Sequence, residues 1–523
     1  IPPFRQKKGT DISTFFYYYA LLIKCKYYPM TRSNPDKPKC FCGIFGIFGT
    51  PDAALHTYYG LHALQHRGQE ASGIITRDVS SDRRTVFNVL KGEGLVSEVF
   101  DQYSDWGKLL TGDAAIGHNR YSTTGASHSR KNIQPFTVHY RDGNLAVAHN
   151  GNLTNESELR RQLVHEGAIF QTTTDSEVIL HLIARSRKED QIEQIKEALH
   201  QIQGAYSLLI MTDDKLIATR DPNGFRPLAI AKYKDAFVVA SETCAFDILP
   251  AEYIRDVAPG EIVIIDRDAI ESGTPKVDTL YPPHEINKKH CIFEYIYFSR
   301  PDSKIFGHNV DKIRRRLGKV LANKYPVFPE GDDKVVVISV PDSSNTVALG
   351  YAQTLLKNGV KAKYEIGLIR SHYIGRTFIE PEQDRREMGV RIKFNTVRGV
   401  LEGKTVVVVD DSIVRGTTSM LLVKLLREAN PKSIHMRISS PPILYPCYYG
   451  MDFPSHTELI ANKMNRDISA IKDYIGLDSL EYLSIDELLS VMHDDNPVNY
   501  CTACFSGNYP LPVNESFNKE MYE

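Results

Sequence analysis

The sequence has little net charge, few cysteines and no long apolar run. Its 63 Lys and Arg residues almost balance 64 Asp and Glu residues, so it lacks the basic surface that binding to nucleic acid or an acidic membrane requires. Eight cysteines in 523 residues are too few for a disulfide scaffold, and any that cluster are better candidates for metal binding or catalysis. No stretch reaches the roughly 20 apolar residues of a membrane helix. We therefore expect a cytoplasmic protein of two or three domains.

The first forty residues differ from the rest. A basic patch precedes a short aromatic and apolar run in "FRQKKGTDISTFFYYYALLIKCKYY", which weakly resembles a signal peptide. The run is too short to span a membrane, and no small-residue cleavage pattern follows it. These features favour a leader segment over a secretory signal peptide. We expect the functional chain to start at Met30. We expect residues 1–41 to be a leader or propeptide that the mature protein lacks.

Two different patterns follow the leader. The pattern of residues 42–283 predicts short strands separated by turns, with helices over 156–166 and 175–186. This combination is typical of a sheet-rich α+β domain. From Lys334 onward, β-branched runs end in acidic and small polar residues before helices, which is typical of a parallel α/β sheet. We expect this second domain over 291–470 and a helical C-terminal segment over 471–523.

The strongest local motif is "VVVVDDSIVRGTTS", residues 406–419. Asp410 and Asp411 end a buried strand and could accept hydrogen bonds from ribose hydroxyls, while the following loop and helix start could hold a phosphate. The alternative without ligand binding is a pair of carboxylates that only caps the helix. The length and order of the motif favour a phosphorylated sugar.

A second strand-end loop, "SVPDSSNTVALGYA", places Asp342, Ser343 and Ser344 before a helix. It suits a pyrophosphate with Mg²⁺, because this ion prefers phosphate oxygens, waters and few protein oxygens. Alone, Pro-Asp-Ser-Ser is also a common turn and helix cap. The arginine-rich stretch 373–395 that follows is either a solvated loop or a mobile lid over a polyphosphate.

Near the start of the first domain, "KCFCGIFGIFG" places Cys42 at the head of a glycine-rich strand. The thiol is either a small core residue or a nucleophile. Downstream, Arg120 could bind a carboxylate, Asp175 an ammonium group, and Asn150 with the amide of Gly151 an oxyanion. Taken singly, Arg120 also suits a surface ion pair, Asp175 a helix cap and Asn150-Gly151 a tight turn. No close Cys-His pairing supplies a base, but the α-amino group of an N-terminal Cys42, with a pKa near 8, could do so.

The order of these motifs resembles the glutamine amidotransferase domain of N-terminal-nucleophile (Ntn) hydrolases, joined to a type I phosphoribosyltransferase domain. This combination resembles the glutamine phosphoribosylpyrophosphate amidotransferase family, in its iron–sulfur, propeptide-bearing form, from Cys42 to about Pro510. The resemblance implies an αββα sandwich followed by a parallel sheet. It also implies an enzyme that hydrolyses glutamine and passes ammonia internally to phosphoribosyl pyrophosphate, in the first committed step of purine biosynthesis.

The resemblance assigns roles to particular residues. Cys42 is the implied nucleophile, and glutamine is held by Arg120, Asn150, Gly151 and Asp175. Mg²⁺ is placed at Ser344, Asp410 and Asp411. The implied phosphoribosyl pyrophosphate site comprises Asp342, Ser343, Ser344, Arg376, Asp410, Asp411, Ser412, Ile413, Val414, Arg415, Gly416, Thr417 and Thr418. Purine nucleotides as feedback inhibitors and a homodimer or homotetramer are further expectations.

Four of the other seven cysteines are candidate metal ligands. Cys501 and Cys504 form a Cys-x-x-Cys pair, whereas Cys291 and Cys447 are distant in sequence. The pair alone suits zinc at least as well as other metals, or the thiols could be free. A set of four also suits a [4Fe–4S] cluster, which the resemblance implies.

Two segments depart from the family pattern. Residues 39–41 are Lys-Cys-Phe, where acidic residues usually precede the nucleophile, and residues 370–372 are Arg-Ser-His, where Lys-Asn-Arg is favoured. The first departure puts self-removal of the leader in doubt, and the second predicts weaker binding of pyrophosphate by this loop.

Two rival functions are a nucleotide-sensing regulatory protein with an inactive amidase domain and an amidotransferase for another acceptor. The intact set of glutamine residues opposes the first, and the 406–419 motif opposes the second.

Overall fold

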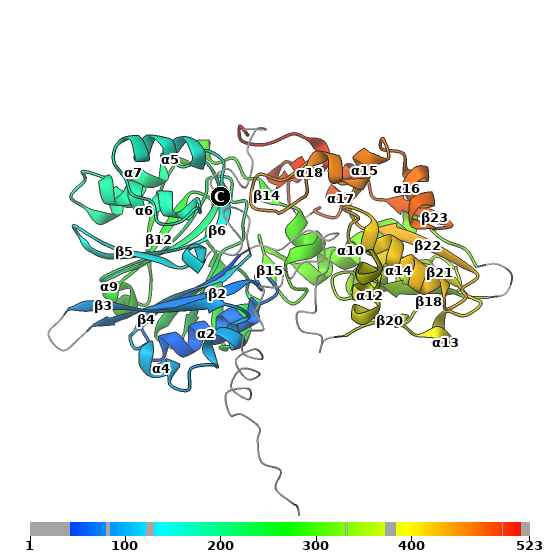
Figure 1. Ribbon diagram of the computed structural model, residues 1–523, viewed down its shortest axis with the longest axis horizontal. Helices are drawn as coiled ribbons and strands as arrows, with labels where there is room; N and C mark the ends of the chain where they lie inside the picture. Colours follow the sequence, from blue (N-terminus) through cyan, green and yellow to red (C-terminus); the bar gives the residue numbers. More distant parts are fainter. Residues whose placement is uncertain are drawn as a thin grey trace, which may run out of the picture.

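The computed structural model describes residues 42–513 except 80–83, 122–129, 330, 332, 372–382 and 494. Two lobes lie side by side, joined through a central segment that contains β14 (His290–Cys291) and β15 (Lys304–Ile305) (Figure 1). Over these described residues, no helix combines the length and the apolar character needed to cross a membrane.

The N-terminal lobe contains two antiparallel sheets. In spatial order, the seven-stranded sheet consists of β11 (Glu252–Asp256), β9 (Ala229–Tyr233), β10 (Ala236–Ala240), β1 (Gly43–Phe48), β4 (Ala114–Arg120), β2 (Ala71–Val79) and β3 (Thr85–Glu93). The six-stranded sheet consists of β13 (Lys276–Thr279), β12 (Glu261–Ile265), β8 (Leu216–Arg220), β7 (Gly204–Thr212), β6 (Gly143–Leu153) and β5 (Phe136–Tyr140).

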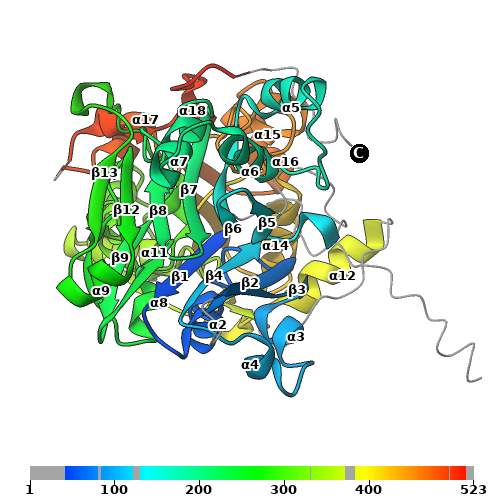
Figure 2. The ribbon, with the colours of Figure 1, turned by 90° about the vertical axis from the view of Figure 1, so that its left-hand side faces the viewer.

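Helices cover the outer face of each sheet (Figure 2). The seven-stranded sheet is covered by α2 (Ala53–Ala63), α3 (Val96–Phe100), α4 (Trp106–Leu109) and α8 (Cys244–Asp247). The six-stranded sheet is covered by α5 (Glu156–His165), α6 (Ser176–Arg185) and α7 (Gln191–Leu199). The remaining short helices of the lobe are η1 (Arg130–Asn132), α9 (Arg267–Ser272) and η2 (Pro283–Glu285). The αββα sandwich is confirmed, and α5 and α6 lie where the apolar spacing predicts helices.

The apolar pattern of β1 explains why this strand is central. Ile44 and Phe48 pack between the two sheets, whereas Phe45 and Ile47 pack under the helices on the opposite face. Because successive side chains of a strand point to opposite faces, a strand buried on both faces needs apolar residues at every position. The Gly-Ile-Phe repeat meets this requirement, and the strand places its preceding residue, Cys42, at the edge of the buried layer.

The C-terminal lobe is built on a parallel sheet. Its order is β18 (Ala362–Tyr364), β17 (Val335–Ser339), β21 (Thr405–Asp410), β22 (Ser433–Ile438) and β23 (Ser479–Tyr482). In the register of the two central strands, Ser339 lies opposite Val409, so both strands end at the same edge. The α/β architecture is confirmed. The fifth strand comes from beyond residue 470, within the segment for which the sequence indicates helices.

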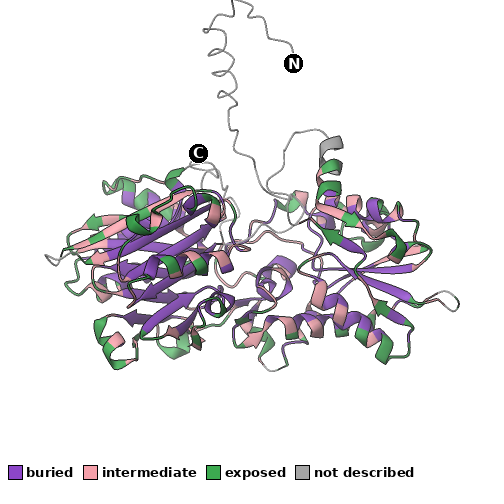
Figure 3. Cartoon of the chain, turned by 90° about the horizontal axis from the view of Figure 1, so that it is seen from below, coloured by how far each residue is buried: buried purple, intermediate pink, exposed green. Residues whose placement is uncertain are grey.

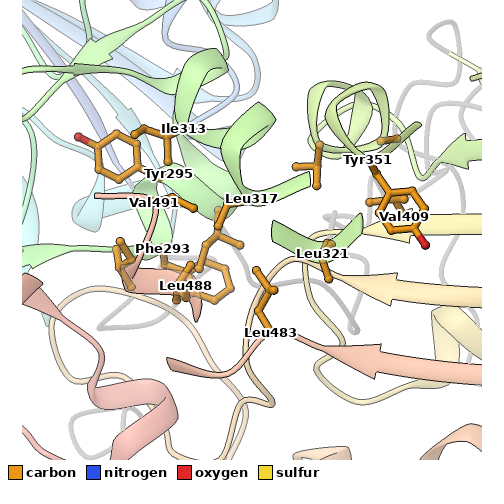
Figure 4. Packing of buried hydrophobic residues seen from close by; sticks show 14 of the residues in the cluster. Phe293, Tyr295, Ile313, Leu317, Leu321, Tyr351, Val409, Leu483, Leu488 and Val491 are labelled. Atoms are coloured by element: carbon orange, nitrogen blue, oxygen red, sulfur yellow. The ribbon is translucent and has the colours of Figure 1, made fainter. Parts of the chain in front are cut away.

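The other elements of this lobe surround the sheet. They are η3 (Glu294–Phe298), β16 (His308–Asn309), α10 (Val310–Lys324), α11 (Asn345–Lys357), β19 (Leu368–Arg370), α12 (Gln383–Lys393), β20 (Phe394–Thr396), α13 (Arg398–Leu401), α14 (Thr417–Arg427), η4 (His456–Glu458), α15 (Ile460–Lys463), α16 (Ile468–Ile475), α17 (Ile485–Leu489), η5 (Pro497–Asn499), β24 (Tyr500–Cys501) and α18 (Ala503–Ser506). Strands of both lobes are largely buried (Figure 3). Leu317 and Leu321 of α10 pack with Phe293 and Leu488 in the largest apolar cluster (Figure 4).

Candidate functional site

The candidate nucleophile, Cys42, lies directly before β1 and is buried. Its Sγ lies 3.6 Å from the backbone carbonyl of Tyr121. Burial raises the pKa of the Cys42 thiol to about 11, although Tyr121 and Arg120 act in the opposite direction. The thiol is therefore protonated at neutral pH and needs a base in order to act as a nucleophile.

Pairing between β1 and β4 brings Arg120 close to Cys42. Gly43 lies opposite Asn119 in this register, and Arg120 is the last residue of β4. The Arg120 side chain is buried, which lowers its pKa, while the carboxylate of Glu70 and the Cys42 thiol raise it. Because a buried guanidinium attracts a carboxylate strongly, this position suits binding of an amino-acid carboxylate.

The second sheet supplies Asn150 and Gly151 from β6. Asn150 Nδ2 lies 3.4 Å from Ser241 Oγ, which accepts a hydrogen bond of 3.0 Å from the amide of Ile44, two residues after the candidate nucleophile. Asn150 Oδ1 is buried and has no hydrogen-bond partner within the part of the chain that the structure describes. Gly151 has no room for a side chain, because a Cβ would lie 1.9 Å from the Ala205 carbonyl oxygen.

Asp175 immediately precedes α6 and is buried. One of its carboxylate oxygens accepts a hydrogen bond of 2.9 Å from the amide of Leu153, which fixes the start of α6 against the end of β6. Its charge acts on the Cys42 thiol, so the two groups lie close together. Both sheets therefore bring a thiol, a guanidinium, a carboxylate and an amide-bearing turn to one place. Such a set can bind both α-groups of glutamine and stabilise the oxyanion that forms at its side-chain amide.

Arg67 is a neighbour of Cys42 to which sequence reasoning assigned no role. Its Nε donates a hydrogen bond of 3.2 Å to the Cys42 carbonyl. The side chain is fully buried, whereas an arginine in "LQHRGQE" is expected on the surface. The sequence offers no signal for this contact, because the carboxylates that balance Arg67 are distant in the chain.

The C-terminal lobe joins its two strand-end loops through short polar contacts. Ser343 Oγ donates a hydrogen bond of 2.5 Å to Asp411, and Ser344 Oγ donates one of 3.2 Å to Asp410. Ser412 Oγ donates a hydrogen bond of 2.6 Å to the other oxygen of Asp411. Asp342 is exposed and forms an ion pair of 3.1 Å with Arg370. The two motifs that the sequence singled out thus form one polar edge.

The loop after the carboxylates leads into α14. Gly416 occupies the N-cap with φ of +83°, and Thr417 and Thr418 begin the helix. Ile413 and Val414 are buried in the apolar clusters on either side of the sheet, so these two residues can offer a ligand only backbone groups. Arg415 forms an ion pair of 3.0 Å with Glu458. Arg376, the remaining predicted binding residue, lies outside the described residues.

The four cysteines that the sequence groups are neighbours in space. Cys291 of β14 lies opposite Cys501 of β24, Cys504 belongs to α18, and Cys447 Sγ accepts a hydrogen bond of 3.3 Å from the amide of Tyr449. Burial raises the pKa of Cys291 to about 11 and raises those of Cys501 and Cys504, with the other thiols adding to the effect. All four are free thiols. Across the described chain, no group of three or more His, Cys, Asp or Glu residues is arranged to hold a metal ion.

The fold and these sites define an Ntn-type glutamine amidotransferase joined to a phosphoribosyltransferase-like domain. A family model described as a glutamine amidotransferase domain matches residues 118–247. Amidophosphoribosyltransferase 2, chloroplastic, of Arabidopsis thaliana is 50% identical over 503 residues, covering 93% of this chain and 84% of the relative. The amidophosphoribosyltransferase of Bacillus subtilis is 48% identical over 476 residues, covering 90% of this chain and 94% of the relative.

Two solved structures match the whole architecture. One, described as the allosteric regulatory enzyme of purine biosynthesis, has a TM-score of 0.82 at 47% identity and covers 91% of this chain and 97% of its own. The other is the glutamine phosphoribosylpyrophosphate amidotransferase of B. subtilis in complex with ADP and GMP, with a TM-score of 0.81 at 46% identity and coverage of 91% and 98%. The chain belongs to the amidophosphoribosyltransferase family.

Proposed function

We propose that the chain forms 5-phosphoribosylamine from glutamine and phosphoribosyl pyrophosphate, with release of glutamate and pyrophosphate. This reaction is the first committed step of de novo purine biosynthesis. The observation that carries the proposal is the arrangement of Cys42, Arg120, Asn150 and Gly151 near strand ends of two sheets, with Asp175 at the start of α6. Family membership supports the same reaction.

In the glutaminase half, the Cys42 thiol attacks the side-chain amide carbon of glutamine. Because burial keeps the thiol protonated, the α-amino group of a mature N-terminal Cys42 takes its proton and passes it to the departing ammonia. Asn150 Nδ2 and the amide of Gly151 donate to the oxyanion, while Arg120 and Asp175 bind the α-carboxylate and α-ammonium groups. Water then cleaves the thioester to give glutamate. This route requires removal of residues 1–41.

In the second half, ammonia attacks the anomeric carbon of phosphoribosyl pyrophosphate and displaces pyrophosphate. Asp410 and Asp411 bind the ribose hydroxyls, residues 412–418 before and at the start of α14 hold the 5′-phosphate, and the loop 342–344 binds the pyrophosphate. Arg376, which lies outside the described residues, is assigned to the same substrate from the family resemblance alone. Carboxylate and hydroxyl oxygens at this edge fit Mg²⁺, which when bound neutralises charge on the pyrophosphate. Internal transfer prevents protonation and loss of ammonia to water.

Cys291, Cys447, Cys501 and Cys504 would hold a [4Fe–4S] cluster, the group that the family resemblance implies. The other three thiols raise the pKa of Cys504, and four cysteine thiolates are the ligand set of such a cluster. Four thiolates also suit a single zinc ion, so the metal content distinguishes the two. Purified protein should contain about four iron atoms and four acid-labile sulfides per chain; zinc without sulfide would contradict the proposal.

The replacement Cys42→Ala tests the function. It should abolish glutamine-dependent phosphoribosylamine formation and preserve the reaction with ammonium, since only the first half needs the thiol. Determination of the N-terminal residue by intact mass completes the test, and the mature chain should begin at Cys42. Glutamine use by the Cys42→Ala protein would exclude this residue as the nucleophile.

We extend the proposal to the regulation, oligomeric state and cellular location of the protein. A B. subtilis relative was solved with ADP and GMP, which supports purine nucleotides as feedback inhibitors of this chain. We also propose a homodimer or homotetramer, to be tested by light scattering, and a cytoplasmic location. The plant relatives are named as chloroplastic proteins, so fractionation should compare the cytosol with plastids where plastids exist.

A further inference from the structure

A buried group of charges lies beside Cys42 and connects the two lobes. Arg67 donates from Nε to the Cys42 carbonyl at 3.2 Å, and its two terminal nitrogens donate to the carboxylate of Glu294 at 3.0 and 2.8 Å. Glu242 accepts a further hydrogen bond from Arg67. Arg67, Glu242 and Glu294 are all fully buried. The backbone of the candidate nucleophile is thus attached to a carboxylate of η3, an element of the C-terminal lobe.

Glu294 also reaches toward the four cysteines. One of its oxygens lies 3.5 Å from Arg226, whose Nε donates a hydrogen bond of 3.0 Å to the Tyr449 carbonyl. Tyr449 in turn donates its amide hydrogen to Cys447 Sγ. The sequence of contacts therefore leads from Cys42 through Arg67, Glu294 and Arg226 to Tyr449, across the boundary between the lobes.

The position of Glu294 is fixed by packing on both sides. Its neighbours Phe293 and Tyr295 point into the apolar cluster of the C-terminal lobe (Figure 4). Ser299 Oγ donates a hydrogen bond of 2.7 Å to Glu294 Oε2. A carboxylate held in this way is a rigid support for the guanidinium of Arg67.

Opposite charges face one another in this group. Arg67 pairs with both Glu242 and Glu294, Arg226 lies 3.5 Å from Glu294, and His66 Nε2 lies 2.8 Å from Glu242. Burial by itself lowers the pKa of Arg67, but Glu294 and Glu242 raise it overall, and Arg67 and Arg226 lower the pKa of Glu294 against the effect of its burial. Arg67 and Glu294 therefore remain charged. Removal of one leaves an uncompensated charge next to Cys42.

We propose that Glu294 is a positioning residue of the glutaminase reaction, which acts through Arg67 on the carbonyl of Cys42. In a mature chain Cys42 has no preceding residue, so its carbonyl is the backbone group that fixes the orientation of its α-amine and thiol. The proposal rests on the role of Cys42 as nucleophile. It makes the geometry of Cys42 dependent on the segment that contains Cys291.

The test compares Glu294→Gln with Glu261→Gln in the mature enzyme. Glu261 also accepts two hydrogen bonds of 2.7 Å from one arginine, Arg255, and serves as a matched control because, among the described residues, it forms no hydrogen bond or ion pair with Cys42, Arg67 or Glu294. Glu294→Gln should lower kcat with glutamine about tenfold or more and leave KM for glutamine and the ammonium-dependent rate within about twofold. Glu261→Gln should change neither rate by more than about twofold. Equal loss of both reactions in Glu294→Gln, or loss of neither, would overturn the proposal.

Further variants make the result decisive. Combining Glu294→Gln with Arg67→Lys should lower kcat no further than Arg67→Lys alone, because both residues act through the same contact; additive losses would oppose this. If Glu294→Gln fails to fold, Ser299→Ala replaces it, with an expected loss of about threefold in glutamine-dependent kcat only. An unchanged rate in Ser299→Ala would then reject the proposal. Cys42→Ala separates the two hypotheses, since glutamine use by that variant contradicts the proposed function itself.

Discussion

Asn152 Nδ2 donates a hydrogen bond of 2.9 Å to the backbone carbonyl of Tyr448, 296 positions later in the chain. Asn152 follows Gly151 in β6, and Tyr448 follows the candidate metal ligand Cys447. The bond therefore connects the candidate oxyanion site directly to the segment that carries Cys447. Together with the contact between Arg226 and Tyr449, it gives the two lobes a polar connection close to the glutamine site.

Asn152→Ala should weaken the coupling between the two reactions. The variant loses the bond to Tyr448, at a cost of about 1 kcal/mol in the free energy of unfolding, and loosens the strand that bears Asn150 and Gly151. We expect glutamate release to exceed phosphoribosylamine formation, because ammonia escapes between the lobes. Measuring both products in one assay checks this. Asn155→Ala, which loses hydrogen bonds within the N-terminal lobe only, is the control; equal product ratios in both variants would contradict the prediction.

The reactivity of Cys42 should depend on pH in two different ways. In a chain that keeps Phe41, the thiol with its pKa raised to about 11 has no amine beside it, so alkylation of Cys42 by iodoacetamide should rise about tenfold per pH unit from pH 7 to 10. In the mature chain, the α-amine with a pKa near 8 accepts the proton, so glutamine hydrolysis should rise and level off above about pH 8. Alkylation rates by mass spectrometry and a pH–rate profile distinguish the two. A plateau near pH 8 in the Phe41 chain would exclude the amine as base.

The sequence predicts best what is local. The Gly-Ile-Phe repeat identifies β1 with Cys42 at its head, and the run before Asp410 identifies β21, because a continuous apolar strand is buried on both faces. The helices over 156–166 and 175–186 follow from their apolar spacing. Such patterns need no knowledge of distant contacts.

Local sequence patterns do not reveal contacts between segments that are distant in the chain. Arg67 and Glu294 are 227 positions apart, and charged residues are normally expected at the surface, so nothing marks them as a buried pair. The strand β23 was missed for a similar reason, since its place in the sheet depends on pairing with β22 and not on a strong pattern of its own. The grouping of Cys291 and Cys447 with the Cys-x-x-Cys pair came from the family resemblance alone.

Asp411→Asn should separate the two reactions in the opposite sense from Cys42→Ala. The carboxylate accepts hydrogen bonds from Ser343 and Ser412, and an amide retains only one acceptor oxygen and brings a donor toward a ribose hydroxyl. Both glutamine- and ammonium-dependent phosphoribosylamine formation should fall about 100-fold, whereas basal glutamine hydrolysis should change less than about threefold. Steady-state assays of glutamate and pyrophosphate measure this. Retained phosphoribosyl transfer would remove Asp411 from the binding site.

Gly416→Ala should weaken binding of phosphoribosyl pyrophosphate by displacing the start of α14. Gly416 has φ of +83°, which is unfavourable for alanine, and an added Cβ would lie 2.2 Å from Cδ1 of Ile460. Gly403→Ala is the matched control, because Gly403 has φ of +64° but no atom within 4 Å of the added Cβ. Both variants should lose about 1 kcal/mol of stability through the backbone term, as urea denaturation will show. Only Gly416→Ala should raise KM for phosphoribosyl pyrophosphate about tenfold, because only there does the added Cβ press on a neighbour, Ile460, whose amide donates to the Val414 carbonyl of the phosphate-binding loop. Equal KM values in the two variants would show that the loop does not hold the phosphate.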